Sequence, residues 1–346
     1  MLTIHSDTHH LHHGAGELYR GRITPCFETP ERADIIARRV AEVGLGDIRA
    51  PASFGLDVLA RVHAPDFLAF LQTAWSEWTA EGNTGDAMAG IWPARDLRRD
   101  RAPIHIDGKL GFYSFDGGAP IMAGTWEAVR QSANVALTGA DLIDAGARSA
   151  FALCRPPGHH AGARAMGGYC YLNNAAIAAQ YLRDKGAGRV AILDVDYHHG
   201  NGSQSIFYDR ADVLFVSIHA DPDVEYPFFL GHADEHGEGA GLGFNVNYPL
   251  PWGAAGGAYA ETLSLACDRI GAFGPDALVV SLGVDTFDGD PISHFKLRGG
   301  DFLNMGRRIA AIGAPTLFVM EGGYAVADIG VNAVNVLSGF QDETGG

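Results

Sequence analysis

The chain has 346 residues and a hydrophobic content of 47%, which is enough for a large buried core. Its 41 acidic and 25 basic residues give a net charge of −16, and this argues against a nucleic-acid-binding function, which needs a basic surface. No apolar run reaches the roughly 18 residues of a membrane span, and the N-terminus lacks the features of a signal peptide. We therefore expect a cytoplasmic protein with no membrane partner, whose acidity suits either a cationic substrate or simple solubility.

The first 145 residues predict two helices separated by an irregular segment. Thr29 followed by Pro30 is typical of a helix start, with Thr as the cap and Pro at the first helical position. Thr125 is predicted to cap a second helix that runs towards Ala145. Between them, residues 75–120 are rich in Gly, Pro and both charges, and the segment is too long for a plain connection. We expect it to be a functional loop or an assembly element.

From residue 149 onward, short apolar segments alternate with amphipathic ones. The apolar segments predict strands at 149–154, 190–195, 213–218, 277–282 and 316–320. The amphipathic segments predict helices at 174–185, 258–273, 301–312 and 331–337. Because no linker or repeat divides the chain, this alternation predicts one α/β domain over residues 1–346, with helices on both faces of a parallel sheet.

Polar residues follow each predicted strand directly. In open α/β sheets, ligands bind at the carboxyl ends of the strands, so these polar clusters are expected to meet at one edge. In chain order the clusters are Arg155 to His160, Asp196 with His198, His219, Asp285, and Glu321 to Tyr324. Their convergence predicts an active site.

Asp196 and His198 have the residue types of a divalent-metal site. They lie two positions apart, so in an extended segment their side chains point the same way. With Asp285 they would make a three-ligand site that leaves a position open for water, as catalytic metal sites do. Asp196 alone would also be compatible with a helix cap.

Three further side chains complete a hydrolytic set. His159 and His160 are candidates for a general base and its partner imidazole. Tyr324, next to a Gly-Gly pair, is a candidate donor to a developing oxyanion. A metal that activates water, a base and an oxyanion donor together indicate hydrolysis of an amide or an ester.

A second group of metal-ligand residues is found in the N-terminal tract of His9, His10, His12 and His13. His-rich tracts can bind metal ions. This one lacks a carboxylate partner in the sequence, so we expect it rather to lie at the rim of the pocket.

The motifs resemble, in order and over most of the chain, the zinc-dependent histone deacetylase-like amidohydrolases of the arginase-deacetylase superfamily. The matching stretches are Arg155-Pro-Pro-Gly-His-His-Ala161, Gly168-Tyr-Cys-Tyr-Leu-Asn173, Leu193-Asp-Val-Asp-Tyr-His-His-Gly200, Ser281-Leu-Gly-Val-Asp285 and Glu321-Gly-Gly-Tyr324. The resemblance implies a three-layer α/β/α domain with a central parallel sheet of about eight strands.

The resemblance also implies roles for individual residues. It places Zn²⁺ on Asp196, His198 and Asp285. Because two carboxylates and one imidazole make a harder ligand set than usual zinc sites, Fe²⁺ is an alternative ion in the cell. The remaining implied roles are His160 as general base, His159 as its electrostatic partner, Tyr324 as stabiliser of the tetrahedral intermediate, and Tyr169 as a wall of the substrate tunnel.

The resemblance implies a second ion and shows one departure. Asp194 would orient His159 and would bind K⁺ together with Ser217 and main-chain groups. Behind the second tandem histidine, many histone deacetylases have an Asp, whereas this chain has Asn201. Because an amide stabilises an imidazolium less than a carboxylate does, we predict a lower pKa for His160.

Within the superfamily the chain is most similar to the bacterial acetylpolyamine amidohydrolases. The likeness lies in Asn201, in the stretch 283–292 and in residues 75–120, which in that group build a dimer and narrow the mouth of the active site. It implies that a small cationic acetylated amine is the substrate and that the protein is a homodimer. The implied substrate-binding positions are Tyr226 and Ile292 in the tunnel and Asp107 at the mouth. A second acidic position of the group falls near Gly118, where Asp116 is the nearest substitute.

Two alternatives remain open from the sequence. A deacetylase of acetyl-lysine side chains in proteins would use the same chemistry and differ only in access to the tunnel. A binding protein that keeps the scaffold without catalysis is the alternative from another class. An arginase-like ureohydrolase is disfavoured because it needs a two-metal site.

Overall fold

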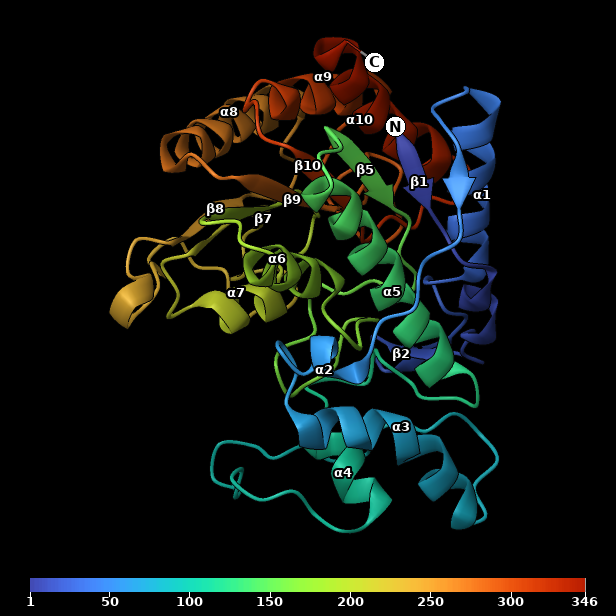
Figure 1. Ribbon diagram of the computed structural model, residues 1–346. Helices are drawn as coiled ribbons and strands as arrows, with labels where there is room; N and C mark the ends of the chain where they lie inside the picture. The colour runs from blue at the N-terminus through green and yellow to red at the C-terminus, as the bar shows by residue number, and fades with distance from the viewer. Residues whose placement is uncertain (346) are drawn as a thin grey trace.

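Eight strands form one parallel sheet in the order β4-β1-β5-β10-β9-β6-β7-β8 (Figure 1). The computed structural model describes residues 1–345. The strands are β1 (Leu2–Ile4), β4 (Ile48–Arg49), β5 (Ser149–Ala152), β6 (Val190–Asp194), β7 (Val213–Ala220), β8 (Asn245–Leu250), β9 (Ala277–Leu282) and β10 (Thr316–Met320). This architecture confirms the predicted α/β class and the central sheet of about eight strands.

Helices cover both faces of the sheet, which confirms the three-layer arrangement (Figure 1). One face is covered by α1 (Pro30–Glu42), α8 (Gly256–Phe273), α9 (Gly299–Ala310) and α10 (Ile329–Thr344). The other is covered by α5 (Thr125–Asp144), α6 (Asn174–Asp184) and α7 (Asn201–Phe207). Because side chains alternate along a strand, Leu193 of β6 packs in the first apolar layer and Ile192 in the second.

The elements that were predicted agree with the structure except at their ends, but the prediction contained neither α7 nor three of the eight strands. The predictions at 277–282 and 316–320 coincide with β9 and β10. The edge strands β4 and β8 and the neighbouring β1 were not predicted, since β1 and β4 are very short and β8 contains Pro249 and two asparagines. Thr29 stands at the cap position of α1 without a capping hydrogen bond. Gly124, not Thr125, precedes α5.

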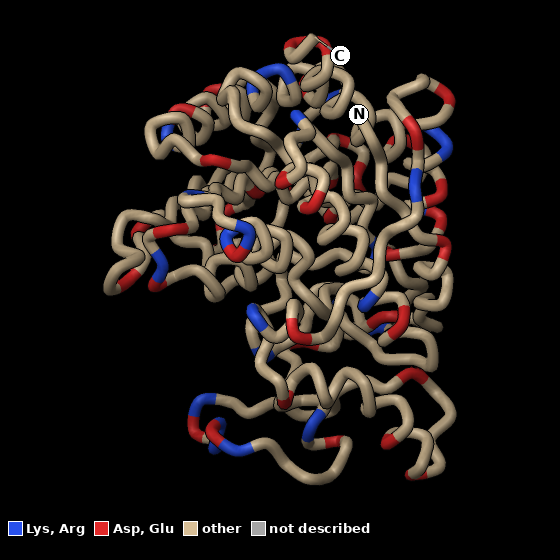
Figure 2. Tube along the Cα trace, in the orientation of Figure 1, with Lys and Arg blue, Asp and Glu red and all other residues tan. Residues whose placement is uncertain are grey.

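Residues 75–120 are more regular than predicted. The segment begins inside α3 (Pro65–Ala80) and includes α4 (Ile106–Phe112). These helices share a third apolar cluster, in which the rings of Phe70 and Tyr113 stack with centroids 4.7 Å apart. The loop between α3 and α4 carries both signs of charge (Figure 2). The segment is therefore not a plain irregular loop, because aromatic packing holds the two helices together although Gly and charged residues surround them.

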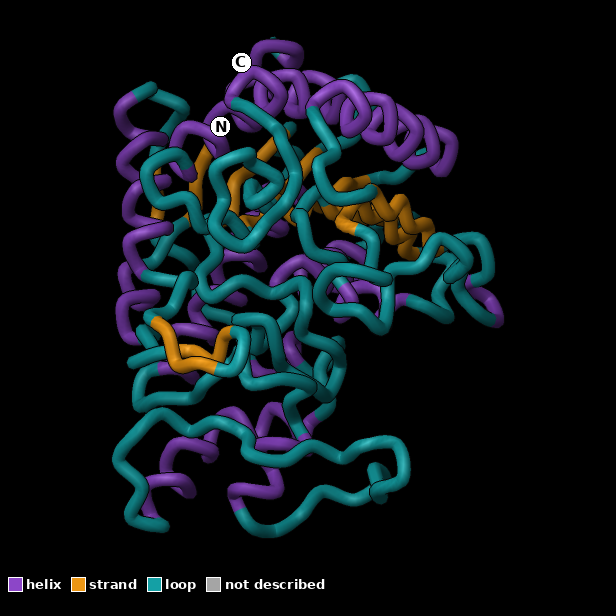
Figure 3. Tube along the Cα trace, turned by 180° about the vertical axis from the view of Figure 1, so that it is seen from behind, coloured by secondary structure: helices purple, strands orange, loops and turns teal. Residues whose placement is uncertain are grey.

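Smaller elements complete the described chain. The antiparallel ribbon of β2 (Glu17–Tyr19) and β3 (Arg22–Thr24) lies apart from the main sheet, as the view from behind shows (Figure 3). Short helical turns are η1 (Asp7–Leu11), α2 (Leu56–Leu59) and η2 (Gly239–Gly241). None of the helices within residues 1–345 combines the length and the apolar character needed to cross a membrane.

Candidate active site

The strand order brings the polar clusters of three strands to one edge of the sheet. β9 lies between β6 and β10, and all three run in parallel. Asp194 pairs in register with Ser281, and Met320 pairs with Leu282, so the chain leaves these strands at the same level. The segments that follow carry Asp196, Asp285 and Glu321. The predicted convergence at the carboxyl ends of the strands is therefore observed.

Asp196, His198 and Asp285 form a buried cluster. One potential ligand atom from each lies within 4.8 Å of the others. His198 Nδ1 lies 3.1 Å from Asp285 Oδ2 and 3.5 Å from Asp196 Oδ1. The fold thus brings together one imidazole nitrogen and two carboxylates from the three residues that the sequence singled out.

Backbone donors hold both carboxylates in place. Asp196 accepts hydrogen bonds from the amides of His198 (2.9 Å) and Gly322 (2.8 Å), and Asp285 accepts one from Tyr197 (2.8 Å). A Cβ atom at Gly322 would come within 2.6 Å of oxygens of both carboxylates, so only glycine allows the backbone this close.

The electrostatics of the cluster fit a bound cation. Burial, followed by the charge of Asp196, raises the pKa of Asp285 to about 7. Burial opposes a charged His198, but the two carboxylates raise the pKa of this imidazole well above its usual value. The two buried carboxylates face only one imidazole, so the negative charge of the cluster is not fully balanced by the protein. The donor set suits a divalent ion, and these three residues would hold it.

The tandem histidines lie beside this cluster with different partners. His159 Nδ1 lies 3.0 Å from Asp194 Oδ2, and His160 Nδ1 lies 2.7 Å from Asn201 Oδ1. Burial favours the neutral form of His159, but the charges of Asp196 and Asp194 raise its pKa to about 10. Burial and the neighbouring charges of His159 and His198 lower the pKa of His160 well below its usual value. One imidazole is therefore charged at neutral pH, and the other is free to accept a proton.

Tyr324 is held at the end of β10 by its own backbone and by a buried arginine. Its amide donates a 2.7 Å hydrogen bond to Asp290 Oδ2. The guanidinium of Arg32 lies 4.8 Å from the centre of its ring and donates hydrogen bonds to the carbonyls of Gly323 and Glu321. Burial raises the pKa of Tyr324 well above its usual value, so its hydroxyl remains a donor.

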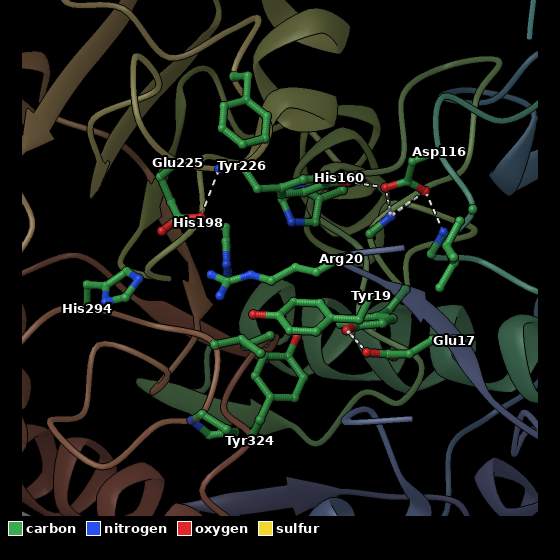
Figure 4. A pocket seen from close by; sticks show the side chains of 18 of the residues that line it. Glu17, Tyr19, Arg20, Asp116, His160, His198, Glu225, Tyr226, His294 and Tyr324 are labelled. Atoms are coloured by element: carbon green, nitrogen blue, oxygen red, sulfur yellow. Dashed lines mark hydrogen bonds between the residues drawn. The ribbon is translucent and has the colours of Figure 1, made fainter. Parts of the chain in front are cut away.

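These groups open into a cavity of about 560 Å³. His160 and Tyr226 lie on one side, and Tyr19 and Tyr324 lie on the other (Figure 4). The lining includes four other predicted residues, namely Tyr169, Ile292, Asp116 and the potential metal ligand His198. The Tyr169 hydroxyl donates to Glu17 Oε1 at 3.0 Å, which fixes this wall of the cavity.

Asp116 supports the wall of the cavity from within. Its carboxylate accepts hydrogen bonds from the Tyr226 hydroxyl at 2.6 Å and from the amides of Gly118 and Gly168. Gly168 has a φ of 52°, and a Cβ there would lie 2.5 Å from His160 and 2.7 Å from the Tyr226 hydroxyl. Asp116 is therefore engaged with the protein, which differs from the open acidic gate expected of a substitute near Gly118.

Asp107 is not brought to the cavity of its own chain. It lies in the first turn of α4, where its amide donates to His105 Nδ1 at 3.3 Å, and its side chain is 66% exposed.

The predicted K⁺ ligands, Asp194 and Ser217, pair in register on β6 and β7 and are fully buried. The Ser217 hydroxyl lies 2.8 Å from His219 Nδ1.

Several lining residues were not found from the sequence. Arg20 comes from the turn after β2, and Glu225 and Trp252 come from loops after β7 and β8. Glu225 accepts hydrogen bonds from the Tyr197 hydroxyl (2.6 Å) and from Trp252 Nε1 (3.1 Å). None of these residues lies in a recognisable motif, since their partners are distant in the chain. Arg32 was missed for the same reason.

A buried triad of potential metal ligands beside two imidazoles and a tyrosine, in a cavity with aromatic walls, is the arrangement of a hydrolase of amide or ester bonds. The family described as "Histone deacetylase domain" matches residues 26–340. "Acetylpolyamine amidohydrolase 2" of Pseudomonas aeruginosa is 61% identical over 99% of both chains. "Acetylpolyamine amidohydrolase" of Mycoplana ramosa is 52% identical over 98% of this chain and 99% of its own.

A solved structure agrees with these relatives. The acetylpolyamine aminohydrolase from Burkholderia pseudomallei superposes with a TM-score of 0.94 at 42% identity, covering 99% of both chains. The chain therefore belongs to the histone deacetylase domain family, and it is an amidohydrolase of the deacetylase type.

Proposed function

We propose that the protein hydrolyses the acetamide of N-acetylated polyamines and diamines, such as acetylputrescine and acetylcadaverine, to acetate and the free amine. The observation that carries this proposal is the pair of aromatic cavity walls, Tyr169 and Tyr226, each of which is held by a carboxylate. Such walls suit an unbranched aliphatic chain. The names of the similar proteins support the same substrate class.

The residues of the site divide the work of hydrolysis. A divalent ion on the triad would supply the Lewis acidity that activates water and polarises the carbonyl. His160 is held through Nδ1 by Asn201, so its Nε2 remains to take a proton from the attacking water and pass it to the leaving amine. His159, charged beside Asp194, stabilises the negative charge that develops. The Tyr324 hydroxyl donates a hydrogen bond to the carbonyl oxygen, where negative charge develops as water adds to the carbon. The C–N bond then breaks as the amine takes up the proton from His160.

We propose Zn²⁺ as the catalytic ion, with Fe²⁺ as the alternative in the cell, because the ligand set is rich in oxygen. A structural K⁺ at Asp194 and Ser217 accords with their full burial and their register on adjacent strands. Metal content of the purified protein, measured by mass spectrometry before and after exchange, tests both ions.

The charges around the cavity favour a cationic substrate. Three carboxylates, from Glu17, Asp116 and Glu225, line it, against the single guanidinium of Arg20 among the lining residues. Burial raises the pKa of both Glu17 and Asp116, which weakens their share of the field. The remaining excess of negative charge steers a cation towards the opening.

In a homodimer, Asp107 of one chain would be able to affect substrate binding in the other. The segment that holds this residue exposes Ile91, Leu97 and Ile104, with 62%, 53% and 85% of their surfaces open. Apolar side chains gathered on one loop suit an interface between copies. Because Asp107 lies outside the cavity of its own chain, its effect on substrate requires a second copy. Ile104→Asp should give monomers in sedimentation, and Leu265→Asp on the exposed face of α8 should not.

The alternative is a deacetylase of acetyl-lysine in proteins. It is favoured by exposed apolar side chains at the opening, since Leu18, Val224 and Trp252 are each about half exposed and could contact a polypeptide.

Rates on N-acetylputrescine, N-acetylcadaverine and an acetyl-lysine peptide, with Tyr324→Phe as the blank, decide between the two. A preference for the small amines supports the proposal. A preference for the peptide supports the alternative. If none of the three substrates is hydrolysed, the remaining hypothesis is a binding protein without catalysis.

A further inference from the structure

The His-rich N-terminal segment meets a carboxylate that is distant in the sequence. Asp34, in α1, lies against η1, so that the Nε2 atoms of His9 and His10 are 3.3 and 3.1 Å from its Oδ1. His5 follows β1, and its ring centre lies 5.0 Å from that of His9. Ligand atoms of His5, His9 and Asp34 all lie within 4.8 Å of one another.

His9 is buried without hydrogen-bond partners. Its surface is 3% exposed, and neither ring nitrogen makes a hydrogen bond. The approach of Nε2 to Asp34 lacks hydrogen-bond geometry although the two atoms are close. His5 Nδ1 is also buried and without a partner. Burying polar groups without partners is unfavourable, so a ligand that these nitrogens could bind would stabilise the cluster.

The spacing suits a shared ion. Two ligands that each lie about 2.0 Å from a tetrahedral ion are about 3.3 Å apart, which matches the separations from Asp34 Oδ1.

We propose that His5, His9, His10 and Asp34 form a second metal site that takes a divalent transition-metal ion of the zinc class. Three imidazoles and one carboxylate form a ligand set that suits such ions, whereas Mg²⁺ and Ca²⁺ favour oxygen ligands. The neighbouring histidines of the tract do not join it. His12 points elsewhere, with Nδ1 3.1 Å from the Thr125 hydroxyl.

The site would fix the backbone that holds the active-site loop. Arg155 donates hydrogen bonds to the carbonyls of His9 (2.6 Å) and His12 (2.8 Å). Its other side pairs with the buried Glu28, which also pairs with Arg32 below Tyr324. An ion on His9 would anchor η1 and, through Arg155, the loop of the tandem histidines. We therefore assign the site a structural role.

Metal counting on variants tests the site. Untagged protein is stripped with chelator, loaded with Zn²⁺ and desalted, and the ions per chain are counted. Wild type should hold two ions per chain, and the variants Asp34→Asn and His10→Gln should hold one each. The matched control is His13→Gln, which changes an exposed histidine of the same tract and should hold two. Asp285→Asn should lose only the active-site ion. Undiminished zinc in Asp34→Asn, or the loss of all zinc in Asp285→Asn, would overturn the proposal.

Thermal unfolding separates this site from the active site. In the Asp285→Asn background, added Zn²⁺ should raise the Tm, because an ion bound only to the folded state stabilises it. The rise should vanish when Asp34→Asn is added. An equal rise in both backgrounds would contradict the proposal. If wild type holds one ion that Asp34→Asn removes and Asp285→Asn keeps, the N-terminal site stands and the proposed catalytic site fails.

Discussion

The Nδ1 atom of His160 lies 2.7 Å from the amide oxygen of Asn201. Because an amide oxygen only accepts hydrogen bonds, this contact places the proton on Nδ1 and leaves Nε2 as the basic nitrogen. The neighbouring His159 faces the Asp194 carboxylate instead. Burial and the charges of His159 and His198 lower the pKa of His160, whereas the charges of Asp196 and Asp194 overcome burial and raise that of His159. The two adjacent imidazoles therefore differ in charge, and only His159 has a carboxylate as its hydrogen-bond partner.

Asn201→Asp should move the acidic limb of the pH–rate profile to higher pH. A carboxylate in this position stabilises the imidazolium and raises the pKa of His160. The base is then protonated at a higher pH, so activity is lost earlier as the pH falls. The measurement is kcat/KM against pH for both proteins at equal metal content. An unmoved acidic limb would show that Asn201 does not tune His160.

Tyr324→Phe should lower kcat by about 10²–10³, the size of the loss when one oxyanion donor is removed. The ring keeps its place over Arg32, and the ligands of the metal cluster are untouched. Metal content and Tm should therefore match those of wild type. Steady-state kinetics on acetylcadaverine and metal counting check the two parts. Full activity in this variant would remove Tyr324 from the mechanism.

The sequence was sufficient for the parts of the site that rest on contiguous motifs. Asp196, His198 and Asp285 follow strands that read clearly as apolar runs, and parallel pairing then brings them together. The bounds of β9 and β10 were predictable because both strands are fully buried and continuously apolar. Family resemblance added the division of roles among these residues, which spacing alone left open.

The sequence was insufficient where a side chain finds its partner across the fold. Glu28 meets Arg155 over 127 positions, and Arg155 meets the carbonyl of His9 over 146. Asp34 completes the N-terminal histidine cluster only because α1 packs beside η1. No local pattern encodes such pairings.

Arg20→Ala should lower KM for acetylputrescine. The exposed guanidinium lines the cavity among three carboxylates and repels the ammonium of the substrate. KM for a neutral acetamide of similar length should change less. Raising the ionic strength should shrink the difference between wild type and variant. Equal effects on charged and neutral substrates would contradict an electrostatic role for Arg20.

Asp107→Ala should have the opposite effect and raise KM for cationic substrates more than for neutral acetamides. The effect should depend on a second copy, because this carboxylate lies outside the cavity of its own chain. In the Ile104→Asp background, Asp107→Ala should therefore change KM little. The same comparison of charged and neutral substrates checks it. A full effect in a monomer would contradict the dimer explanation.

Glu28→Gln should lower the free energy of unfolding by roughly 3–5 kcal/mol at neutral pH, since it leaves two buried guanidiniums without their counterion. Burial alone would raise the pKa of Glu28, but Arg155 and Arg32 lower it to about 2. A carboxyl whose pKa is depressed on folding stabilises the protein above its unfolded pKa. The stabilisation is lost as the pH falls from about 4.5 towards 2.

Urea unfolding between pH 7 and pH 3 measures both effects of Glu28→Gln. Wild type should lose stability more steeply than the variant below pH 4.5, because only wild type carries the shifted carboxyl. Glu42→Gln is the matched control, since Glu42 pairs with Arg39 on the surface of α1 at 3.3 Å. An exposed pair contributes at most about 1 kcal/mol. If the two variants were equally stable, the buried pairing of Glu28 would not hold the active-site loops.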